Sequence, residues 1–244
     1  MTEHRIEGRN AVIEAMRVGR EIDKILINSE GDSTLGHIAA KARDLGITVV
    51  KTDRRKLDSL SETGSHQGVI AFVAATTYAT VEDMLELARE RGEKPLIVIC
   101  DELSDPHNLG AIVRTADAAG AHGVIIPKRR SATLTATVAK ASAGAIEHVL
   151  IAKVPNITAT IKELKEQGIW VYGAAAEGSQ SMYKADFADA AAIVIGNEGE
   201  GLGRLVRENC DVLVSIPMKG GMSSLNASNA AAVLLYEAVR QRIG

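Results

Sequence analysis

Residues 95–244 alternate between continuous apolar runs and segments with helical patterning, and few folds accommodate this alternation. The first run is Leu96-Ile97-Val98-Ile99-Cys100, which no polar residue interrupts. Such a run is typical of a strand buried on both faces of a parallel sheet. Similar runs follow at residues 123–126, 149–152, 169–172, 192–195 and 212–216. The sequence therefore predicts an α/β fold, with helices packed on a parallel sheet.

Helical patterning fills most of the intervals between the runs. The expected helices lie around residues 109–119, 134–142, 157–167, 202–208 and 225–240. In doubly wound sheets, ligands bind beyond the carboxyl ends of the strands. The chemistry of this chain is therefore expected in the segments that follow each strand.

The amino-terminal residues have shorter elements and form a separate α/β unit in our interpretation. The expected strands lie at residues 24–27, 47–50 and 68–75, and the expected helices at 11–18, 33–45 and 53–60, with Asn10 as the cap of the first helix. A charged amphipathic helix is expected over residues 81–91 and ends at Gly92. These patterns predict a domain over residues 1–75, a linker with a helix over 76–94 and a second domain over 95–244.

The charge balance constrains the kind of partner. The chain of 244 residues has 28 Lys and Arg against 31 Asp and Glu, a formal net charge of −3. This balance argues against a protein that holds nucleic acid by bulk positive charge. Phe, Trp and Tyr make up only 3% of the residues, too few for a base-stacking platform. Composition alone thus argues against a nucleic-acid partner.

Other classes of protein are excluded by simple patterns. Cys100 and Cys210 lie far apart with no CxxC pair, and the six histidines show no metal-ligand spacing. No apolar run approaches the ~20 residues that a membrane helix needs, and the amino terminus has no apolar signal core. We therefore expect a cytoplasmic protein without a metal site and without a membrane segment.

Polar segments follow three of the predicted strands. In the first, Asn108 lies near a helix start, and Arg114 lies six residues on, about 9 Å along the helix axis. Alternatively, Asn108 is only a helix cap and Arg114 a surface charge. No GxGxxG pattern follows this strand, which argues against a dinucleotide-binding dehydrogenase.

The second segment, residues 196–203, contains four glycines, which allow a backbone to approach a ligand closely. Glu198 and Glu200 would repel a phosphate, so a neutral or cationic ligand fits this loop better. The third segment places Ser224 and Asn226 before the last helix, where they present two hydrogen-bonding side chains. The alternatives are a flexible turn for the second segment and a helix cap for the third.

Together the three segments resemble the ordered motifs of the SpoU/TrmH family. The matching stretches run from Asn108 to Ala116, from Ile195 to Leu202 and from Ile216 to Asn226. Near the amino terminus, Gly8 to Val12 and His66 to Val69 resemble the small substrate-binding domain of the ribosomal-RNA branch of this family. The resemblance thus covers essentially the whole chain.

The resemblance implies a SPOUT methyltransferase domain whose carboxyl terminus forms a trefoil knot, preceded by a small α/β RNA-binding domain. It implies S-adenosylmethionine as cofactor, a homodimer and methyl transfer to the ribose 2′-hydroxyl of a guanosine in 23S ribosomal RNA, in the peptidyl-transferase region. Two alternatives are kept: a ribose methyltransferase acting on tRNA, and a non-catalytic RNA-binding or ribosome-assembly factor.

The resemblance also implies roles for individual residues. The expected catalytic residues are Asn108, Arg114, Glu198, Ser224 and Asn226. The expected cofactor-binding residues are Ile195, Gly196, Ile216, Met218 and Leu225. Candidate RNA contacts are Arg9 and the local basic clusters, namely Arg54, Arg55, Lys128, Arg129 and Arg130.

Overall fold

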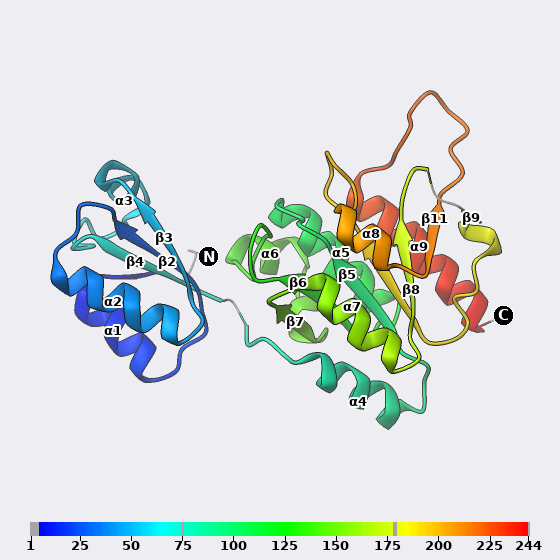
Figure 1. The fold of residues 1–244 in the computed structure, drawn as a ribbon, viewed down its shortest axis with the longest axis horizontal. Coiled ribbons are helices and arrows are strands. Elements are labelled where there is room, and N and C mark those ends of the chain that lie inside the picture. Colours follow the sequence, from blue (N-terminus) through cyan, green and yellow to red (C-terminus); the bar gives the residue numbers. More distant parts are fainter. Residues whose placement is uncertain (1–4, 75, 178–179, 244) are drawn as a thin grey trace. The chain divides into compact units, whose positions relative to one another are not determined.

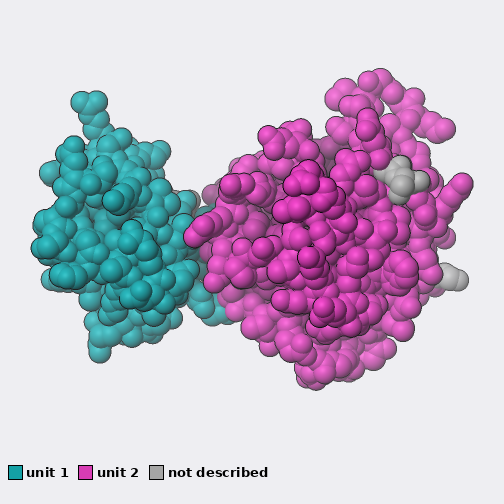
Figure 2. All heavy atoms as spheres, in the orientation of Figure 1, with its two compact units in different colours: residues 1–77, 133–136 teal, residues 78–132, 137–244 magenta. Residues whose placement is uncertain are grey.

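The structure is a computed structural model that describes residues 5–74, 76–177 and 180–243. The chain divides into two compact units, which Figures 1 and 2 distinguish. Unit 1 comprises residues 1–77 and 133–136, and unit 2 comprises residues 78–132 and 137–244.

Unit 1 is a four-stranded sheet with the strand order β1-β4-β2-β3. Its strands are β1 (Arg5–Glu7), β2 (Ile22–Asn28), β3 (Thr48–Thr52) and β4 (Val69–Val73). The β2–β3 pair is parallel, whereas β4 is antiparallel to both β1 and β2. Three helices cover this sheet: α1 (Arg9–Arg17), α2 (Ser33–Asp44) and α3 (Arg54–Leu60).

The two faces of this sheet have separate apolar cores. On one face, buried residues of α1 and α2 such as Val12 and Ile38 pack against Ile25 and Ala71. On the other face, Leu57 of α3 packs in a smaller cluster with residues of β2 and β4. The first helix begins one residue before Asn10, so the predicted Asn10 cap is wrong. Gly8 takes the cap position at φ 90°, where a residue without Cβ is favoured.

Unit 2 contains a seven-stranded sheet in the order β7-β6-β5-β10-β8-β11-β9, and every pair in it is parallel. The strands are β5 (Leu96–Cys100), β6 (Gly123–Pro127), β7 (Ile151–Val154), β8 (Trp170–Ala174), β9 (Gln180–Ser181), β10 (Ala191–Ile195) and β11 (Val212–Ser215). The predicted α/β fold with a parallel sheet is confirmed, and the trefoil knot stays a prediction.

Helices cover both faces of this sheet (Figure 1). They are α4 (Val81–Arg91), α5 (Pro106–Ala118), α6 (Ala136–Ala141), α7 (Ile157–Glu166), α8 (Arg204–Asn209) and α9 (Ala227–Ile243), with short 3-10 helices at Ala145–Glu147 and Met182–Lys184. Residues of α4, α7 and α8, including Met84 and Ile161, pack with Ile97 and Ile99 in one large core. Helices α5 and α9 pack against each other, and α9 also contacts β10. None of the described helices is long and apolar enough to cross a membrane.

Candidate active site at the carboxyl ends of β5 and β10

Strands β5 and β10 are neighbours, and they end at the same level. Cys100 is the partner of Ile195 in the ladder, and the Asp101 N–H continues the pairing by donating to the Ile195 carbonyl over 2.8 Å. The loops that follow the two strands therefore leave the sheet side by side. This is the edge at which the parallel sheet predicts a ligand site.

Three polar side chains, one from each predicted motif, form a hydrogen-bonded chain at this edge. Asn108 donates from Nδ2 to Glu198 Oε1 over 2.7 Å. Asn226 donates from Nδ2 to Asn108 Oδ1 over 3.0 Å. Asn108 is 7% exposed, whereas Glu198 and Asn226 are exposed. We call this cluster, Asn108 with Glu198 and Asn226, the amide–carboxylate triad.

The amide of Asn108 is available for the triad because another residue caps its helix. Helix α5 begins at Pro106, and Asp105 accepts the His107 N–H over 2.8 Å as the N-cap. The cap interpretation of Asn108 is therefore wrong. Asn226 has both roles, since its Oδ1 accepts the Ser228 N–H over 2.9 Å at the start of α9 while its Nδ2 reaches Asn108.

The glycine-rich loop after β10 is held by specific bonds rather than being a flexible turn. Asn197 and Gly201 exchange two backbone hydrogen bonds of 2.9 Å. A Cβ on Gly196 would lie 2.3 Å from the carbonyl carbon of Gly201, so only glycine fits where the backbone passes this close to Gly201. Asn197 Nδ2 also donates to the Glu102 carbonyl over 3.0 Å, which ties the loop to the segment after β5.

Asp101 provides a second tie between these segments. Its Oδ2 accepts the Gly203 N–H over 2.7 Å. Burial raises the pKa of Asp101, because the ionised carboxylate is desolvated, and the Gly203 bond acts in the opposite direction. Sequence reasoning missed Asp101 and Asn197 as positioning residues. Their only sequence signal is that each lies within two residues of a strand end.

The preceding residue, Cys100, is fully buried, and burial raises the pKa of its thiol to about 12. At neutral pH it is therefore a neutral thiol, which argues against cysteine nucleophilic chemistry at this strand end. Among residues 5–74, 76–177 and 180–243, no three His, Cys, Asp or Glu side chains are grouped so that they could hold a metal ion.

Two of the predicted catalytic residues do not join the triad within one chain. Arg114 is exposed on α5, and within the described part of the chain it has no hydrogen-bond or ion-pair partner. Ser224 is exposed in the segment between β11 and α9. That segment, residues 216–226, has no regular secondary structure (Figure 1).

In the chain, the predicted cofactor residues lie between Asn108 and Asn226, two of them before Glu198 and three after it. Ile195 is the buried last residue of β10, and Gly196 follows it. Ile216, Met218 and Leu225 belong to the irregular segment, where residues 216–225 make no backbone–backbone hydrogen bond to any described residue. Their N–H and C=O groups are therefore free to bind a ligand.

The predicted RNA contacts fall on both units. In unit 2, Lys128, Arg129 and Arg130 are exposed directly after β6, at the same sheet edge as the triad, and Arg130 pairs with Glu102 over 3.2 Å. In unit 1, Arg54 and Arg55 are exposed at the start of α3. Arg9 pairs with Asp32 over 2.8 Å.

Comparison with known families adds an independent observation to this geometry. Residues 95–236 match the model of the SpoU rRNA Methylase family. Residues 5–79 match the model described as RNA 2′-O ribose methyltransferase substrate binding. The chain belongs to the SpoU rRNA methylase family.

Individual proteins of the family resemble the chain over most of its length. A protein of Bacillus subtilis (strain 168), YacO, is 49% identical over 236 residues, which are 96% of this chain and 94% of YacO; its name assigns it to the TrmH family of tRNA/rRNA methyltransferases. The crystal structure of the SpoU methyltransferase AviRb from Streptomyces viridochromogenes, in complex with the cofactor AdoMet, matches with a TM-score of 0.63 at 28% identity, over 98% of this chain and 90% of AviRb.

A third match is shorter. The TrmH/SpoU tRNA modifying enzyme of A. aeolicus is similar with a TM-score of 0.56 at 32% identity, and the match covers 66% of this chain and 84% of that enzyme.

Family membership makes the chain an RNA 2′-O-methyltransferase that uses S-adenosylmethionine, so the non-catalytic alternative is wrong. The residues present fit this cofactor. Backbone donors and acceptors are free along residues 216–225, as recognition of an adenine edge requires. The acidic Glu198 and Asp101 suit a sulfonium cation, whereas they would repel a nucleotide phosphate.

Proposed function

We propose that this protein transfers a methyl group from S-adenosylmethionine to the ribose 2′-hydroxyl of a guanosine in 23S ribosomal RNA, in the peptidyl-transferase region. The observation that carries the proposal is the amide–carboxylate triad, because it joins all three family motifs at one sheet edge. The bound cofactor supplies an electrophilic methyl group. The residues around it have to align that group with a ribose oxygen, and alignment of this kind contributes much of the rate in a displacement reaction.

Each predicted site residue receives a role in this proposal. Gly196 and the backbone of Ile195, Ile216, Met218 and Leu225 bind the cofactor. Asn108, Glu198 and Asn226 hold the glycine-rich loop and the last loop in register, and Ser224 adds a hydroxyl that binds the ribose. The groups that contact the RNA phosphates are the half-buried Arg9 and the exposed basic residues Arg54, Arg55, Lys128, Arg129 and Arg130.

Arg114 is the proposed group that acts on the 2′-hydroxyl. A guanidinium group stays protonated in proteins at neutral pH, so it is a poor base. We therefore assign to Arg114 the binding of a backbone phosphate and the stabilisation of the developing alkoxide, rather than proton abstraction.

The proposal includes a homodimer in which Arg114 serves the partner's site. Asn108 and Arg114 lie six residues apart on α5, so their side chains point about 120° apart around the helix axis. Within one chain, Asn108 bonds to Glu198 and Asn226, whereas Arg114 is exposed to solvent. A second copy of the chain, packed beside α5, would receive the guanidinium at its own triad.

The ribosomal substrate is favoured over tRNA by the length of the similarities. The match to the tRNA modifying enzyme of A. aeolicus covers 66% of this chain. Unit 1 adds a region that matches a substrate-binding model, which a larger structured RNA would use.

The test incubates the protein with methyl-labelled S-adenosylmethionine and either unmodified 23S ribosomal RNA fragments or unmodified tRNA. Digestion to nucleosides and mapping of the modified position identify the product. We expect 2′-O-methylguanosine in the 23S fragment and no label in tRNA. Label in tRNA with unlabelled 23S RNA would overturn the substrate, and another labelled nucleoside would overturn the guanosine assignment.

A further inference from the structure

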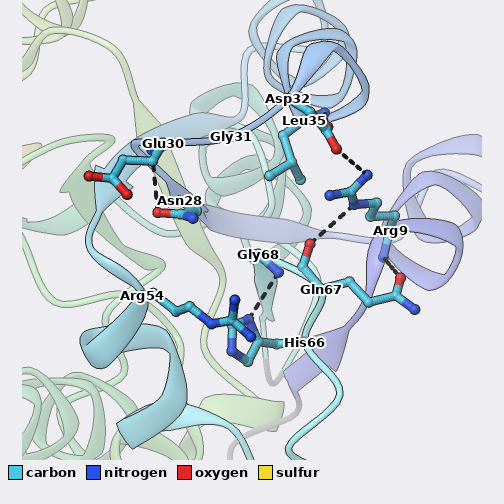
Figure 3. A pocket seen from close by; sticks show the side chains of 10 residues that line it. All are labelled: Arg9, Asn28, Glu30, Gly31, Asp32, Leu35, Arg54, His66, Gln67 and Gly68. Atoms are coloured by element: carbon cyan, nitrogen blue, oxygen red, sulfur yellow. Dashed lines mark hydrogen bonds and ion pairs between the residues drawn. The ribbon is translucent and has the colours of Figure 1, made fainter.

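Unit 1 contains a pocket of about 580 Å³ that includes none of the residues assigned to cofactor binding or methyl transfer (Figure 3). It lies where the end of β2, the start of α2 and the turn before β4 meet. The lining residues come from these elements and from α1 and α3, and they are Arg9, Asn28, Glu30, Gly31, Asp32, Leu35, Arg54, His66, Gln67 and Gly68. A pocket of this size is large enough for one small polar ligand.

The walls of this pocket are fixed by the backbone. Gln67 has φ 50°, a left-handed conformation that costs free energy for a residue with a side chain. Gly68 follows with φ 84°, and a Cβ there would lie 2.9 Å from Leu35 Cδ1. On the other side, a Cβ on Gly31 would lie 2.7 Å from the same carbon atom. Both walls thus pack closely on Leu35, and the pocket is a built feature of the unit.

Most hydrogen-bond acceptors in the pocket are already occupied. Asp32 accepts the Arg9 guanidinium over 2.8 Å and the Leu35 N–H over 3.2 Å. Gln67 Oε1 accepts the Arg9 N–H over 3.1 Å. His66 is 3% exposed, and its Nδ1 accepts the Gly68 N–H over 3.0 Å, so Nε2 carries the proton that Asp58 accepts.

Several donors, in contrast, have no partner within the described part of the chain. They are the Arg54 guanidinium, the Gln67 Nε2 group and the Asn28 Nδ2 group, since Asn28 uses only its Oδ1, which accepts the Glu30 N–H over 3.3 Å. Figure 3 shows the Glu30 carboxylate turned away from the other side chains. The pocket therefore offers donors to a ligand that is rich in acceptors.

The charges narrow the class of ligand. The Arg9–Asp32 ion pair is neutral as a pair, which leaves Arg54 as the cation free to bind an anion. One free guanidinium suits one phosphate group, and two amide donors suit the carbonyl oxygens and ring nitrogens of a nucleobase. The guanidinium groups of Arg9 and Arg54 also provide planar faces on which an unstacked base packs.

We infer that this pocket binds one unpaired nucleotide of the RNA substrate, at a place in the RNA distinct from the methylated ribose. Arg54 binds the phosphate, and Asn28 and Gln67 donate to the base. This inference rests on the proposed function for its source of nucleotides. Unit 1 thereby selects RNA that displays an unpaired base.

The test measures binding of the full chain to a fluorescein-labelled single-stranded RNA hexamer by fluorescence anisotropy at one fixed salt concentration. Arg54→Ala is expected to raise Kd about tenfold, which is the factor that one charge-assisted hydrogen bond carries. Asn28→Asp keeps the acceptor for the Glu30 N–H but removes the donor, and it is expected to weaken binding as well. A duplex of the same sequence is expected to show no such difference.

Arg43→Ala is the matched control, because Arg43 is an exposed arginine on α2 of the same unit, does not line the pocket and is not among the proposed RNA contacts. Equal losses of hexamer affinity in the two arginine variants would contradict the nucleotide pocket, because both losses would then reflect only the removal of a positive charge. A nucleoside 5′-monophosphate that binds as tightly as the hexamer would overturn RNA as the source of the nucleotide.

Methyl transfer to the 23S fragment separates the two proposals. If the wild type methylates the 23S fragment but Arg54→Ala binds the hexamer as tightly as the wild type, the nucleotide pocket is contradicted and the proposed function stands. If Arg54→Ala weakens hexamer binding but the wild type does not methylate the 23S fragment, the ribosomal substrate is contradicted and the nucleotide pocket stands.

Discussion

The amide of Asn108 shows how a single side chain links distant segments of this fold. Its two ends bond to residues 90 and 118 positions further along the chain. This is possible because Asp105 caps the helix and Pro106 occupies its first turn, where a missing N–H costs nothing. A buried amide with both ends bonded fixes its own orientation. The two loops that contact it are therefore positioned by one residue.

For a single residue, our prediction concerns Arg114. Arg114→Ala is expected to lower methyl transfer about 100-fold or more, because it removes a group that stabilises charge in the transition state. Calorimetry is expected to give an S-adenosylmethionine Kd within about twofold of wild type, since the residue binds RNA rather than cofactor. Arg91→Ala, another exposed arginine on a helix of unit 2, serves as the control.

Mixing two variants tests where Arg114 acts. If it serves the partner's site, Arg114→Ala and Asn108→Ala chains mixed together regain activity, since one site of the mixed dimer is complete. Absence of recovery would place Arg114 in its own chain's site. Full activity of Arg114→Ala alone would contradict any catalytic role.

Among the elements, the loop of residues 196–203 depends on one close backbone approach. An added Cβ at position 196 meets the carbonyl carbon and oxygen of Gly201 and the nitrogen of Leu202, all within 2.5 Å. Backbone atoms cannot rotate away as a side chain does, so the loop itself must move. Glu198 would move with it and lose its bond to Asn108.

We therefore predict that Gly196→Ala lowers methyl transfer about 100-fold, the loss that a displacement of about 1 Å causes in an aligned site. Gly36→Ala is the control, because nothing lies within 4 Å of an added Cβ there, its backbone is not left-handed and it belongs to α2, away from the proposed cofactor-binding segments. The measurement is single-turnover transfer, together with thermal unfolding to show that both variants fold. Equal rates in the two variants would disprove the role of the close approach.

The sequence predicts most elements well where one physical signal dominates. Helix α4 occupies 81–91 as expected, because Thr80 and Asp83 form a capping box at one end and Gly92 takes the left-handed position at the other. The expected strand at 149–152 lies two residues later, at Ile151–Val154. Strand β7 is at an edge of the sheet, where Lys153 in the strand breaks the apolar run that guided the prediction.

Other features have no local signal. Strands β1 and β9 contain three and two residues, and long-range pairing rather than local preference makes them strands. The arrangement of the candidate active site also has no local sequence signal. The motifs identify Asn108, Glu198 and Asn226 as candidates, but their mutual bonds depend on how the chain folds. The ties through Asp101 and Asn197 are likewise tertiary contacts between segments about 100 residues apart.

At the scale of the whole molecule, a net charge of −3 and an RNA substrate have to be reconciled. Local placement of charge resolves this, because phosphates respond to cations within about a Debye length, roughly 10 Å at 0.1 M salt. Lys128, Arg129 and Arg130 are exposed at the sheet edge that also carries the triad. Arg130 pairs with Glu102, whereas Lys128 and Arg129 have no ion-pair partner among the described residues, so the loop after β6 presents unpaired positive charge to an RNA.

Replacing Lys128, Arg129 and Arg130 together with Gln is therefore expected to weaken RNA binding and to flatten its salt dependence. Each lost phosphate contact reduces the slope of log K against log salt concentration by about 0.7 to 0.9. The control replaces Arg89, Arg91 and Lys94, which are exposed just before β5 and so lie at the opposite edge of the sheet. Both triple variants remove three positive charges, so bulk electrostatics predicts equal losses, whereas a local site predicts a change of slope only for the first. Anisotropy titrations of a 23S RNA fragment at several salt concentrations decide between the two, and an unchanged slope would remove residues 128–130 from the RNA interface.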